Sequence, residues 1–229
     1  MPQIKYLRPA ALATFFKAVD ANPDGGERIR DRAVFRLMLA LGLRAAEVGL
    51  LKMRDVDMAD PSRPRIYVTR VKEKHWRKDR ATGERRYVRR ERRGDWYTLD
   101  PQGAAIVAIK AWLKERAARP KAGKRWLLAR ESDALFLTRH SAGISASYLR
   151  HIVMAYGRAA GMKVSSHAFR HTAGVRCAMK GLNSFEIAQR LGHVSSLSTE
   201  HYVKTYGPER ERQDDRANRA IEGNGDDSL

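Results

Sequence analysis

The chain has 229 residues, and 45 Lys and Arg against 26 Asp and Glu give it a net charge of +19. This basic excess argues against a neutral surface and indicates a polyanionic partner. Hydrophobic residues form 43% of the chain, which is enough for a buried core and argues against disorder of the whole chain. The single cysteine, Cys177, excludes an intramolecular disulfide and a cysteine-rich zinc site and favours a reducing cytoplasm. No apolar run suits a membrane span or export signal, so we expect no membrane partner.

The charge is concentrated in one segment and reversed in another. Residues 70–93 contain 12 Lys and Arg and 4 acidic residues, whereas residues 207–229 contain 4 Arg and 7 acidic residues. Residues 1–206 therefore carry a net charge of +22. A charge run taken alone is often only a solvated face or a disordered arm. For the body as a whole, nucleic acid is the partner we expect.

The first part of the chain is predicted to be helical. Pro9 is well placed at the start of a helix, and the turn-forming residues 22–26 end it. A second helix is expected over residues 28–41, ending at Gly42. Residues 44–52 also have helical spacing.

Two runs of β-branched and aromatic residues, 66–71 and 95–99, bracket the basic segment. They predict a β-hairpin with a long, charged tip. Asp100 and Pro101 then form a good N-cap and first-turn pair for a helix that ends before Pro120.

The remainder of the body is expected to be a loop over residues 121–130 followed by helices. Asn183, with Glu186 three residues later, has the pattern of a helix cap. Helices are expected over residues 145–160, 168–180, 184–191 and 196–206, and Gly207 and Pro208 end the last one. With no internal repeat or linker, we predict one mainly α domain with a small antiparallel β-sheet over residues 1–207, then a tail at 208–229.

Arg44 lies in an apolar stretch, and a guanidinium in such a setting needs hydrogen-bonding partners. An internal pair with Glu47, three residues later on the same helical face, explains Arg44 as well as a functional role does.

A second polar cluster spans residues 166–172. His167 and Arg170 lie three residues apart, so one helix face presents both to a single anionic group. His167 and His171, four residues apart, have the spacing of two metal ligands. Because no Glu or Cys accompanies them locally, a zinc site is not favoured.

A third cluster changes the interpretation of the first two. It begins with Leu191-Gly192-His193, and Tyr202 follows nine residues after that histidine. In this order and at these spacings, the three clusters resemble the tyrosine recombinase, or phage integrase, family. Each motif alone is common, and the specificity lies in the combination over residues 6–206. The motif residues are Arg44, Glu47, His167, Arg170, His193 and Tyr202.

The resemblance implies a DNA recombinase that needs no metal or nucleotide cofactor. Tyr202 would attack a DNA phosphodiester and leave a 3′-phosphotyrosyl link. Arg44 and Arg170 would donate hydrogen bonds to the phosphate oxygens in the transition state. His167 would be the base or hydrogen-bond partner of the tyrosine, and His193 would complete the phosphate site.

Two supporting roles follow from the same resemblance. Glu47 would orient the active-site arginine or brace its helix. The family usually protonates the leaving 5′-oxygen with a lysine on a β-hairpin, which favours Lys72 here. Lys74 is the alternative, because strand alternation puts both lysines on one face.

The sequence departs from the family pattern in two ways. The pattern starts within the first ten residues, without the additional helical domain of typical members. It therefore resembles the short recombinases that invert fimbrial promoters, or a trimmed catalytic domain. The hairpin is also long, an insertion over residues 70–95, and we expect its basic residues to follow DNA phosphates. They are Lys74, Arg77, Lys78, Arg85, Arg86, Arg89, Arg90, Arg92 and Arg93.

Several alternatives stay open. Tyr206, four residues after Tyr202, is the rival nucleophile, or packs at the helix end. Residues 209–221 would dock onto a neighbouring subunit of a homotetramer on paired double-stranded DNA sites, or form a solvated acidic tail. Accessory DNA-bending proteins would help a chain that lacks a second clamping domain. The competing functions are a non-catalytic DNA-binding or regulatory protein with a recombinase fold, and a type IB topoisomerase-like enzyme that cleaves and rejoins strands. The Ala and Arg content suggests a bacterial, phage or plasmid gene. We expect the protein to be cytoplasmic and associated with the nucleoid.

Overall fold

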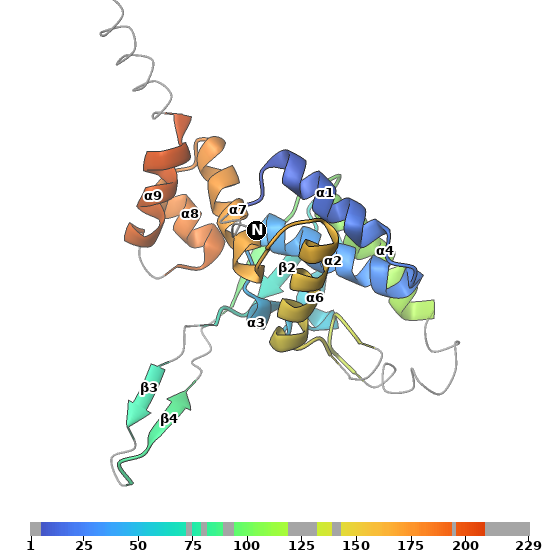
Figure 1. Ribbon diagram of the computed structural model, residues 1–229, viewed down its shortest axis with the longest axis horizontal. Coiled ribbons are helices and arrows are strands. Elements are labelled where there is room, and N and C mark those ends of the chain that lie inside the picture. Colours follow the sequence, from blue (N-terminus) through green and yellow to red (C-terminus); the bar gives the residue numbers. More distant parts are fainter. Residues whose placement is uncertain are drawn as a thin grey trace, which may run out of the picture.

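The computed structural model describes residues 6–71, 75–78, 82–88, 94–118, 132–138, 143–193 and 196–208. These residues are mostly helical, with a small antiparallel sheet, as the sequence predicts (Figure 1). None of the helices in these ranges combines the length and apolar character needed to cross a lipid bilayer. The helices are α1 (Pro9–Asp20), α2 (Gly25–Leu41), α3 (Ala45–Val48), a 3-10 turn η1 (Met53–Asp55), α4 (Ala104–Ala118), α6 (Ala146–Ala159), α7 (Ser166–Met179), α8 (Ser184–Leu191) and α9 (Leu197–Tyr206). The strands are β1 (Val56–Asp57), β2 (Arg65–Val68), β3 (His75–Lys78), β4 (Arg85–Val88) and β5 (Asp95–Thr98).

The boundaries of α2 place the first part of the site. The helix begins at Gly25, three residues before the predicted start. The Asp24 side chain accepts a hydrogen bond from the Glu27 N–H at 2.9 Å and caps the helix there. It ends at Gly42, whose φ of +61° lies in the left-handed region. A Cβ at Gly42 would lie 2.2 Å from the Leu191 side chain, so glycine lets the end of α2 approach α8.

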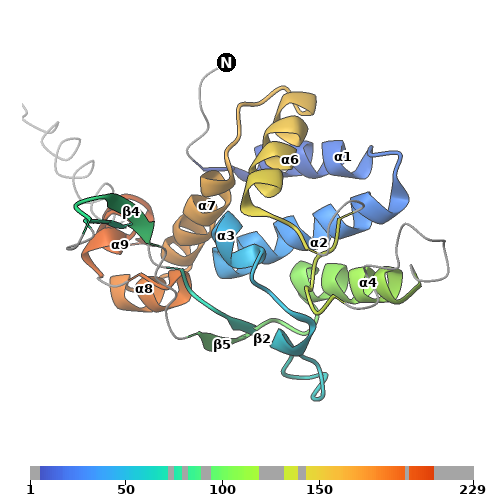
Figure 2. The same ribbon diagram turned by 90° about the horizontal axis from the view of Figure 1, so that it is seen from below.

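The main core holds α7 against α2. Phe15, Phe35 and Phe169 form an aromatic cluster in which ring centroids lie 5.2 to 5.4 Å apart. On the other side of α2 lies α4, with the fully buried Trp112 (Figure 2). Because Phe169 is fixed in this core, the position of the neighbouring Arg170 on α7 is fixed as well.

The sheet has the strand order β1-β2-β5, and both pairings are antiparallel. Ile66 lies opposite Tyr97, so the two strand-like runs pair as predicted. Between them, β3 and β4 form a second antiparallel pair in which Arg77 lies opposite Arg86. Figure 1 shows this β3–β4 hairpin projecting away from the helical body. The predicted long hairpin is therefore present.

The helix expected over residues 44–52 is much shorter, because the chain after Val48 turns and pairs with a later segment. The Met53 N–H donates to the Asp133 carbonyl at 2.7 Å, and the Leu135 N–H donates to the Leu51 carbonyl at 2.8 Å. These long-range backbone bonds compete with continuation of the helix, and α3 has only four residues.

The helix α4 begins later than predicted. The Asp100 side chain accepts from the Gln102 N–H at 3.0 Å, and its carbonyl accepts from the Gly103 N–H at 3.0 Å. These bonds close a turn, so the helix begins at Ala104, and the predicted cap and first-turn roles of Asp100 and Pro101 are wrong. The loop predicted over residues 121–130 and the segment 209–229 lie outside the described residues.

The helices α7, α8 and α9 form a group at one end of the molecule (Figure 1). The predicted cap of α8 is confirmed: Asn183 accepts from the N–H groups of Phe185 and Glu186, and its own N–H donates to the Glu186 carboxylate at 2.8 Å. A separate apolar cluster, which includes Ile187 and Tyr202, attaches α9 to α7 and α8. The fold thereby packs Tyr202, the last of the predicted motif residues, against α7, the helix that carries His167 and Arg170.

Candidate active site

Arg44 and Glu47 lie where α3 begins, next to the end of α2. The Arg44 N–H donates to Oε2 of Glu47 at 2.9 Å, and its Nη1 donates to Oε1 at 3.0 Å. The internal pair expected from the spacing therefore forms. The Arg44 side chain is 26% exposed and that of Glu47 is fully buried, so part of the Arg44 side chain is accessible from solution.

Arg70 also binds Glu47, although the sequence analysis did not single it out. Its Nη1 lies 3.1 Å from Oε2 of Glu47, Nη2 donates to the Arg190 carbonyl at 2.6 Å, and Nε donates to the Tyr97 hydroxyl at 3.2 Å. Arg70 is buried. The signal was available, because Arg70 follows an apolar strand, the same kind of setting that indicated a role for Arg44.

Gly192 explains part of the Leu-Gly-His motif. Its φ is +66°, and it ends α8 in the left-handed region. A Cβ there would lie 2.6 Å from the Arg70 side chain. Glycine is therefore required both for the turn and for the close approach of Arg70, and the turn delivers His193 directly afterwards.

Arg170 is the most deeply placed cation of the site. It is 2% exposed, and its Nη1 donates to the Gly42 carbonyl at 2.7 Å. Its Nη2 is buried and has no hydrogen-bond partner among the described residues. Burial, together with the nearby charge of Arg44, lowers the pKa of Arg170 to about 9. The site therefore holds a donor and a positive potential that an anion would satisfy.

His193 lies near the same positive charges. Burial lowers its pKa to about 4, and the charges of Arg170, Arg44 and Arg70 act in the same direction, as does His167. The imidazole is therefore neutral near pH 7 and can donate one N–H. His167 lies exposed in the first turn of α7.

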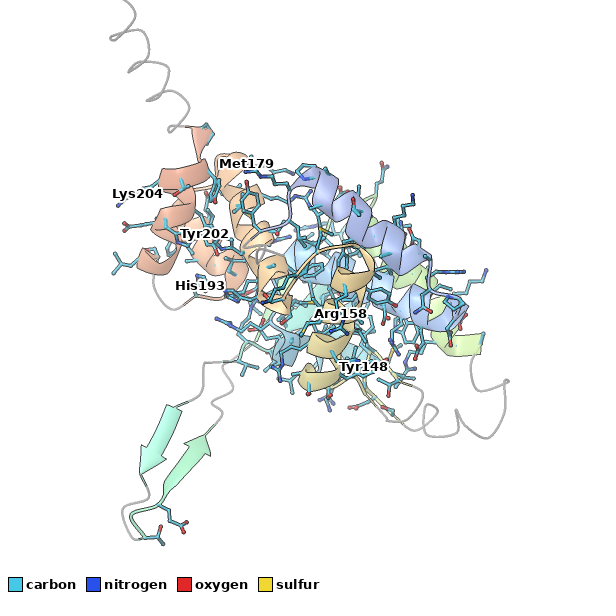
Figure 3. The ribbon with its side chains drawn as sticks, in the orientation of Figure 1. Tyr148, Arg158, Met179, His193, Tyr202 and Lys204 are labelled. Atoms are coloured by element: carbon cyan, nitrogen blue, oxygen red, sulfur yellow. The ribbon has the colours of Figure 1, made fainter. Side chains whose placement is uncertain are left out.

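Tyr202 lies on α9 with its hydroxyl turned into the protein. The hydroxyl oxygen is 2.9 Å from Nδ1 of His171, and the residue is 4% exposed. Figure 3 shows Tyr202 and His193 in one region of the molecule, which α7, α8 and α9 form. Burial raises the pKa of Tyr202, and the charge of Arg170 opposes this effect.

The hydrogen-bond partner of Tyr202 differs from the expectation. The sequence favours His167 as that partner, whereas the structure places His171 at the hydroxyl. One helical turn of α7 separates the two histidines, and the packing of α9 along α7 decides which of them the tyrosine meets. Tyr206, the rival nucleophile, has its ring 5.3 Å from that of Tyr6, in an edge-to-face contact.

All of the site residues described above lie within the part of the chain that one family pattern matches. The model of the phage integrase family matches residues 5–207. The chain belongs to that family.

Two relatives are similar in sequence to this chain along most of its length. Tyrosine recombinase XerC of Pelotomaculum thermopropionicum is 29% identical over 182 residues, which are 78% of this chain and 51% of that protein. Type 1 fimbriae regulatory protein FimB of Escherichia coli K12 is 24% identical over 200 residues, which are 86% of this chain and 83% of FimB. The chain thus spans about half the length of the XerC relatives that it matches.

Solved structures of the family share the fold. The Tn1549 transposon integrase in complex with transposon right end DNA has a TM-score of 0.66 and 17% identity, covering 95% of this chain and 66% of that one. The XerA recombinase has a TM-score of 0.63 and 21% identity, covering 96% of this chain and 66% of that one. The predicted fold, mainly α with a small antiparallel sheet, is confirmed.

Part of the predicted phage integrase site lies outside the described residues. This applies to the two candidate general acids and to four hairpin arginines, namely Lys72, Lys74, Arg89, Arg90, Arg92 and Arg93. The other four hairpin cations lie at paired positions of β3 and β4, with Arg77 opposite Arg86 and Lys78 opposite Arg85.

The described ranges contain no group of three or more His, Cys, Asp or Glu side chains that could hold a metal ion. His167 and His171 have the spacing of two metal ligands, but Nδ1 of His171 lies at hydrogen-bond distance from the Tyr202 hydroxyl.

Proposed function

We propose that this phage integrase family chain is a site-specific DNA recombinase that cleaves and rejoins DNA by transesterification at Tyr202. The observation that carries the proposal is the buried Nη2 of Arg170, which no polar group in the described part of the chain satisfies, beside the other cations of the site. A donor of this kind is costly unless an anion satisfies it. A DNA phosphate supplies that anion.

Three side chains would bind the phosphate, namely those of Arg170, Arg44 and His193. Arg170 is fixed through the Gly42 carbonyl, and Arg44 is fixed through Glu47. Two such guanidinium groups stabilise the negative charge that develops on the non-bridging oxygens in the transition state. His193, neutral near pH 7, donates an N–H to the same phosphate. This assigns Glu47 the supporting role expected for it.

The reaction is a transesterification in which one ester bond replaces another. The Tyr202 oxygen attacks phosphorus, its proton passes to His167 or to water, and the bond from phosphorus to the 5′-oxygen breaks. Lys72, or Lys74 in its place, gives a proton to the leaving 5′-oxygen. The product is a 3′-phosphotyrosyl link, whose bond energy lets a free 5′-hydroxyl reverse the step. No nucleotide or metal cofactor is required by this chemistry.

The name of the XerC relatives supports recombination over the two competing functions. XerC is named a tyrosine recombinase, which supports a catalytic function, whereas the name of FimB, a fimbriae regulatory protein, only gives no support to a topoisomerase. A non-catalytic relative would not need to keep Arg44, Arg170, His193 and Tyr202 together.

The assembly is part of the same proposal. Residues 1–207 would form the catalytic domain, with the β3–β4 hairpin as a DNA-binding insertion, and residues 208–229 would form the tail. We propose a homotetramer on paired double-stranded DNA sites that docks through residues 209–221, with accessory DNA-bending proteins as further partners at the nucleoid. Truncation at Gly207 should abolish tetramer formation, and a truncated chain that assembles normally would reject this role for the tail.

The decisive experiment traps the covalent intermediate. Wild-type protein is incubated with nicked suicide DNA substrates without metal or ATP, and denaturing gels are used to detect protein–DNA adducts. The proposal predicts an adduct with the wild type and with Tyr206→Phe, and none with Tyr202→Phe. An adduct that persists in Tyr202→Phe would move the nucleophile to Tyr206. Tight, salt-sensitive binding with no adduct would favour the non-catalytic function.

A further inference from the structure

The last turn of α2 ends in backbone carbonyls that have no N–H partner inside the helix, as at the end of any α-helix. This turn has no Lys or Arg of its own to compensate for them. The Ala40 carbonyl instead accepts two hydrogen bonds from the Arg190 guanidinium, from Nη2 at 3.0 Å and from Nε at 3.3 Å. Arg190 lies on α8, 150 residues further along the chain. A side chain of α8 therefore caps the end of α2.

The next two carbonyls lie against two arginines of the site. Nη2 of Arg70 lies 3.4 Å from the Leu41 carbonyl oxygen, and Nη1 of Arg170 donates to the Gly42 carbonyl at 2.7 Å. Three consecutive carbonyls thus bind three guanidinium groups from three distant segments. Because Arg170 is held by the Gly42 carbonyl, its position depends on where the end of α2 lies.

Arg190 also fixes the end of α8, which leads to His193. The Arg190 carbonyl accepts a hydrogen bond from Nη2 of Arg70 at 2.6 Å. The His193 N–H donates to the Ala188 carbonyl of the same helix at 2.8 Å. The side chain of Arg190 therefore joins the ends of α2 and α8, and Arg170 and His193 are attached to these two ends.

The Arg190 side chain lines a pocket that is separate from the phosphate site. The pocket has a volume of about 400 Å³, and Arg36, Arg176 and Lys180 contribute to it as well. Among the described residues, none of the three side chains assigned to the phosphate lines this pocket. The role of Arg190 toward the phosphate is therefore indirect.

We propose that Arg190 is a positioning residue, which sets the placement of Arg170 relative to His193 by joining the ends of α2 and α8. This inference rests on the proposed function, because that function assigns both groups to one DNA phosphate. Donors stabilise a transition state only when they are held in the right geometry, and a misplacement of about 1 Å can reduce a rate about 10²-fold. Loss of Arg190 slows cleavage and leaves the phosphate contacts of bound DNA in place.

Arg190→Ala tests the proposal in single-turnover reactions with nicked suicide DNA. The rate of adduct formation should fall about 10²-fold, whereas the slope of log DNA affinity against log salt concentration should not change, because no phosphate contact is lost. Arg176→Ala is the matched control, since it removes a cation from the same pocket without breaking a hydrogen bond to α2. An unchanged rate in Arg190→Ala would overturn the proposal. A slope reduced by about 0.9 would also overturn it, because Arg190 would then contact DNA directly.

Chemical rescue separates positioning from a general loss of stability. Free guanidinium can enter the space left by the Arg190 side chain from the adjoining pocket and donate to the Ala40 carbonyl. Guanidinium chloride, below the range that unfolds the protein, should accelerate Arg190→Ala about tenfold relative to an equal concentration of sodium chloride. It should not accelerate the wild type or Arg176→Ala. A variant that is merely destabilised would be slowed, because guanidinium is a denaturant. Absence of acceleration in Arg190→Ala would overturn the proposal.

Failure of this inference and failure of the proposed function give different results. A wild type that forms no adduct rejects the proposed function, and the melting temperature then tests the contact alone. Guanidinium should raise the melting temperature of Arg190→Ala and lower that of the wild type, and lowering in both would overturn the inference. If Arg190→Ala does not fold, Arg190→Lys replaces it, because lysine keeps the apolar stem and the charge but not the planar pair of donors. A wild-type rate in Arg190→Lys would likewise overturn the inference.

Discussion

The Glu47 carboxylate lies 3.1 Å from the guanidinium of Arg70, and both side chains are almost completely removed from solvent. The same carboxylate binds Arg44, and Arg70 binds the Arg190 carbonyl at the end of α8. One buried carboxylate therefore connects the segment that carries Arg44 with the segment that leads to His193. The geometry of the phosphate site depends on a group that need not contact DNA.

Replacing Glu47 tests this dependence. Glu47→Ala leaves Arg70 buried without its counter-charge, and we expect a loss of about 3–5 kcal/mol in the free energy of unfolding. Urea denaturation measures it. Glu200→Ala is the control, since it breaks an exposed pair with Lys204, and it should cost about 0.3–0.5 kcal/mol. Equal losses in the two variants would contradict the structural role assigned to Glu47.

Arg170→Lys separates binding from catalysis. A lysine keeps the charge but cannot reach the Gly42 carbonyl and a phosphate oxygen with the rigid fork of a guanidinium. The rate of adduct formation should fall about 10²- to 10³-fold, as when one preorganised donor is removed, while DNA affinity changes little. Arg158→Lys, an exposed exchange on α6, should leave both unchanged. Comparable losses of affinity and rate would mean that Arg170 serves only to bind DNA.

His193 should make stability depend on pH. Its pKa is lowered from 6.5 to about 4 in the folded protein, so between these values the unfolded chain binds a proton that the folded chain does not. The stability that a neutral His193 provides is complete above pH 6.5 and is lost as the pH falls toward 4. The melting temperature, followed from pH 7 to pH 4, should therefore fall less in His193→Gln than in the wild type. Parallel curves would show that His193 ionises normally in the folded protein.

Gly174→Ala should have opposite effects in two backgrounds. In the wild type its Cβ would lie 2.7 Å from the ring of Tyr202, and such overpacking costs about 1–3 kcal/mol. In Tyr202→Ala the overlap is removed, and the higher helix propensity of alanine should stabilise α7 by up to about 1 kcal/mol. Urea unfolding of the four proteins measures both effects. A destabilising effect of equal size in both backgrounds would contradict the close packing of Tyr202 on α7.

The hairpin arginines should account for much of the salt dependence of DNA binding. Replacing six of them with alanine should reduce the slope of log affinity against log salt concentration by about 0.7 to 0.9 for each DNA phosphate that the protein then leaves un-neutralised. The six are Arg85, Arg86, Arg89, Arg90, Arg92 and Arg93. Lys110→Ala with Lys114→Ala, two exposed positions of α4, is the control and should leave the slope unchanged. An unchanged slope in the sixfold variant would remove the hairpin from the DNA interface.

Local signals in the sequence determined most helix boundaries and the pairing of β2 with β5. The cap of α8 is an example: Asn183 and Glu186 are three residues apart, and their hydrogen bonds form within one turn whatever lies around the helix. The order of the motifs also indicated the family before any contact was known. Where a distant segment competes, local signals fail, as for α3, which the pairing of Leu51 with Leu135 cuts short.

Only the tertiary structure decided how the site residues are attached to one another. Arg70 lies 23 residues from Glu47 and 120 from Arg190, and Tyr202 lies 31 residues from His171. No local periodicity relates residues at such separations. Which histidine meets the tyrosine depends on how α9 packs along α7. Which arginine shares a carboxylate depends on how Arg70, in the segment after β2, reaches Glu47 and the end of α8. Those distances are set by the packing of the whole core, because buried charges and hydroxyls must find partners wherever the fold places them.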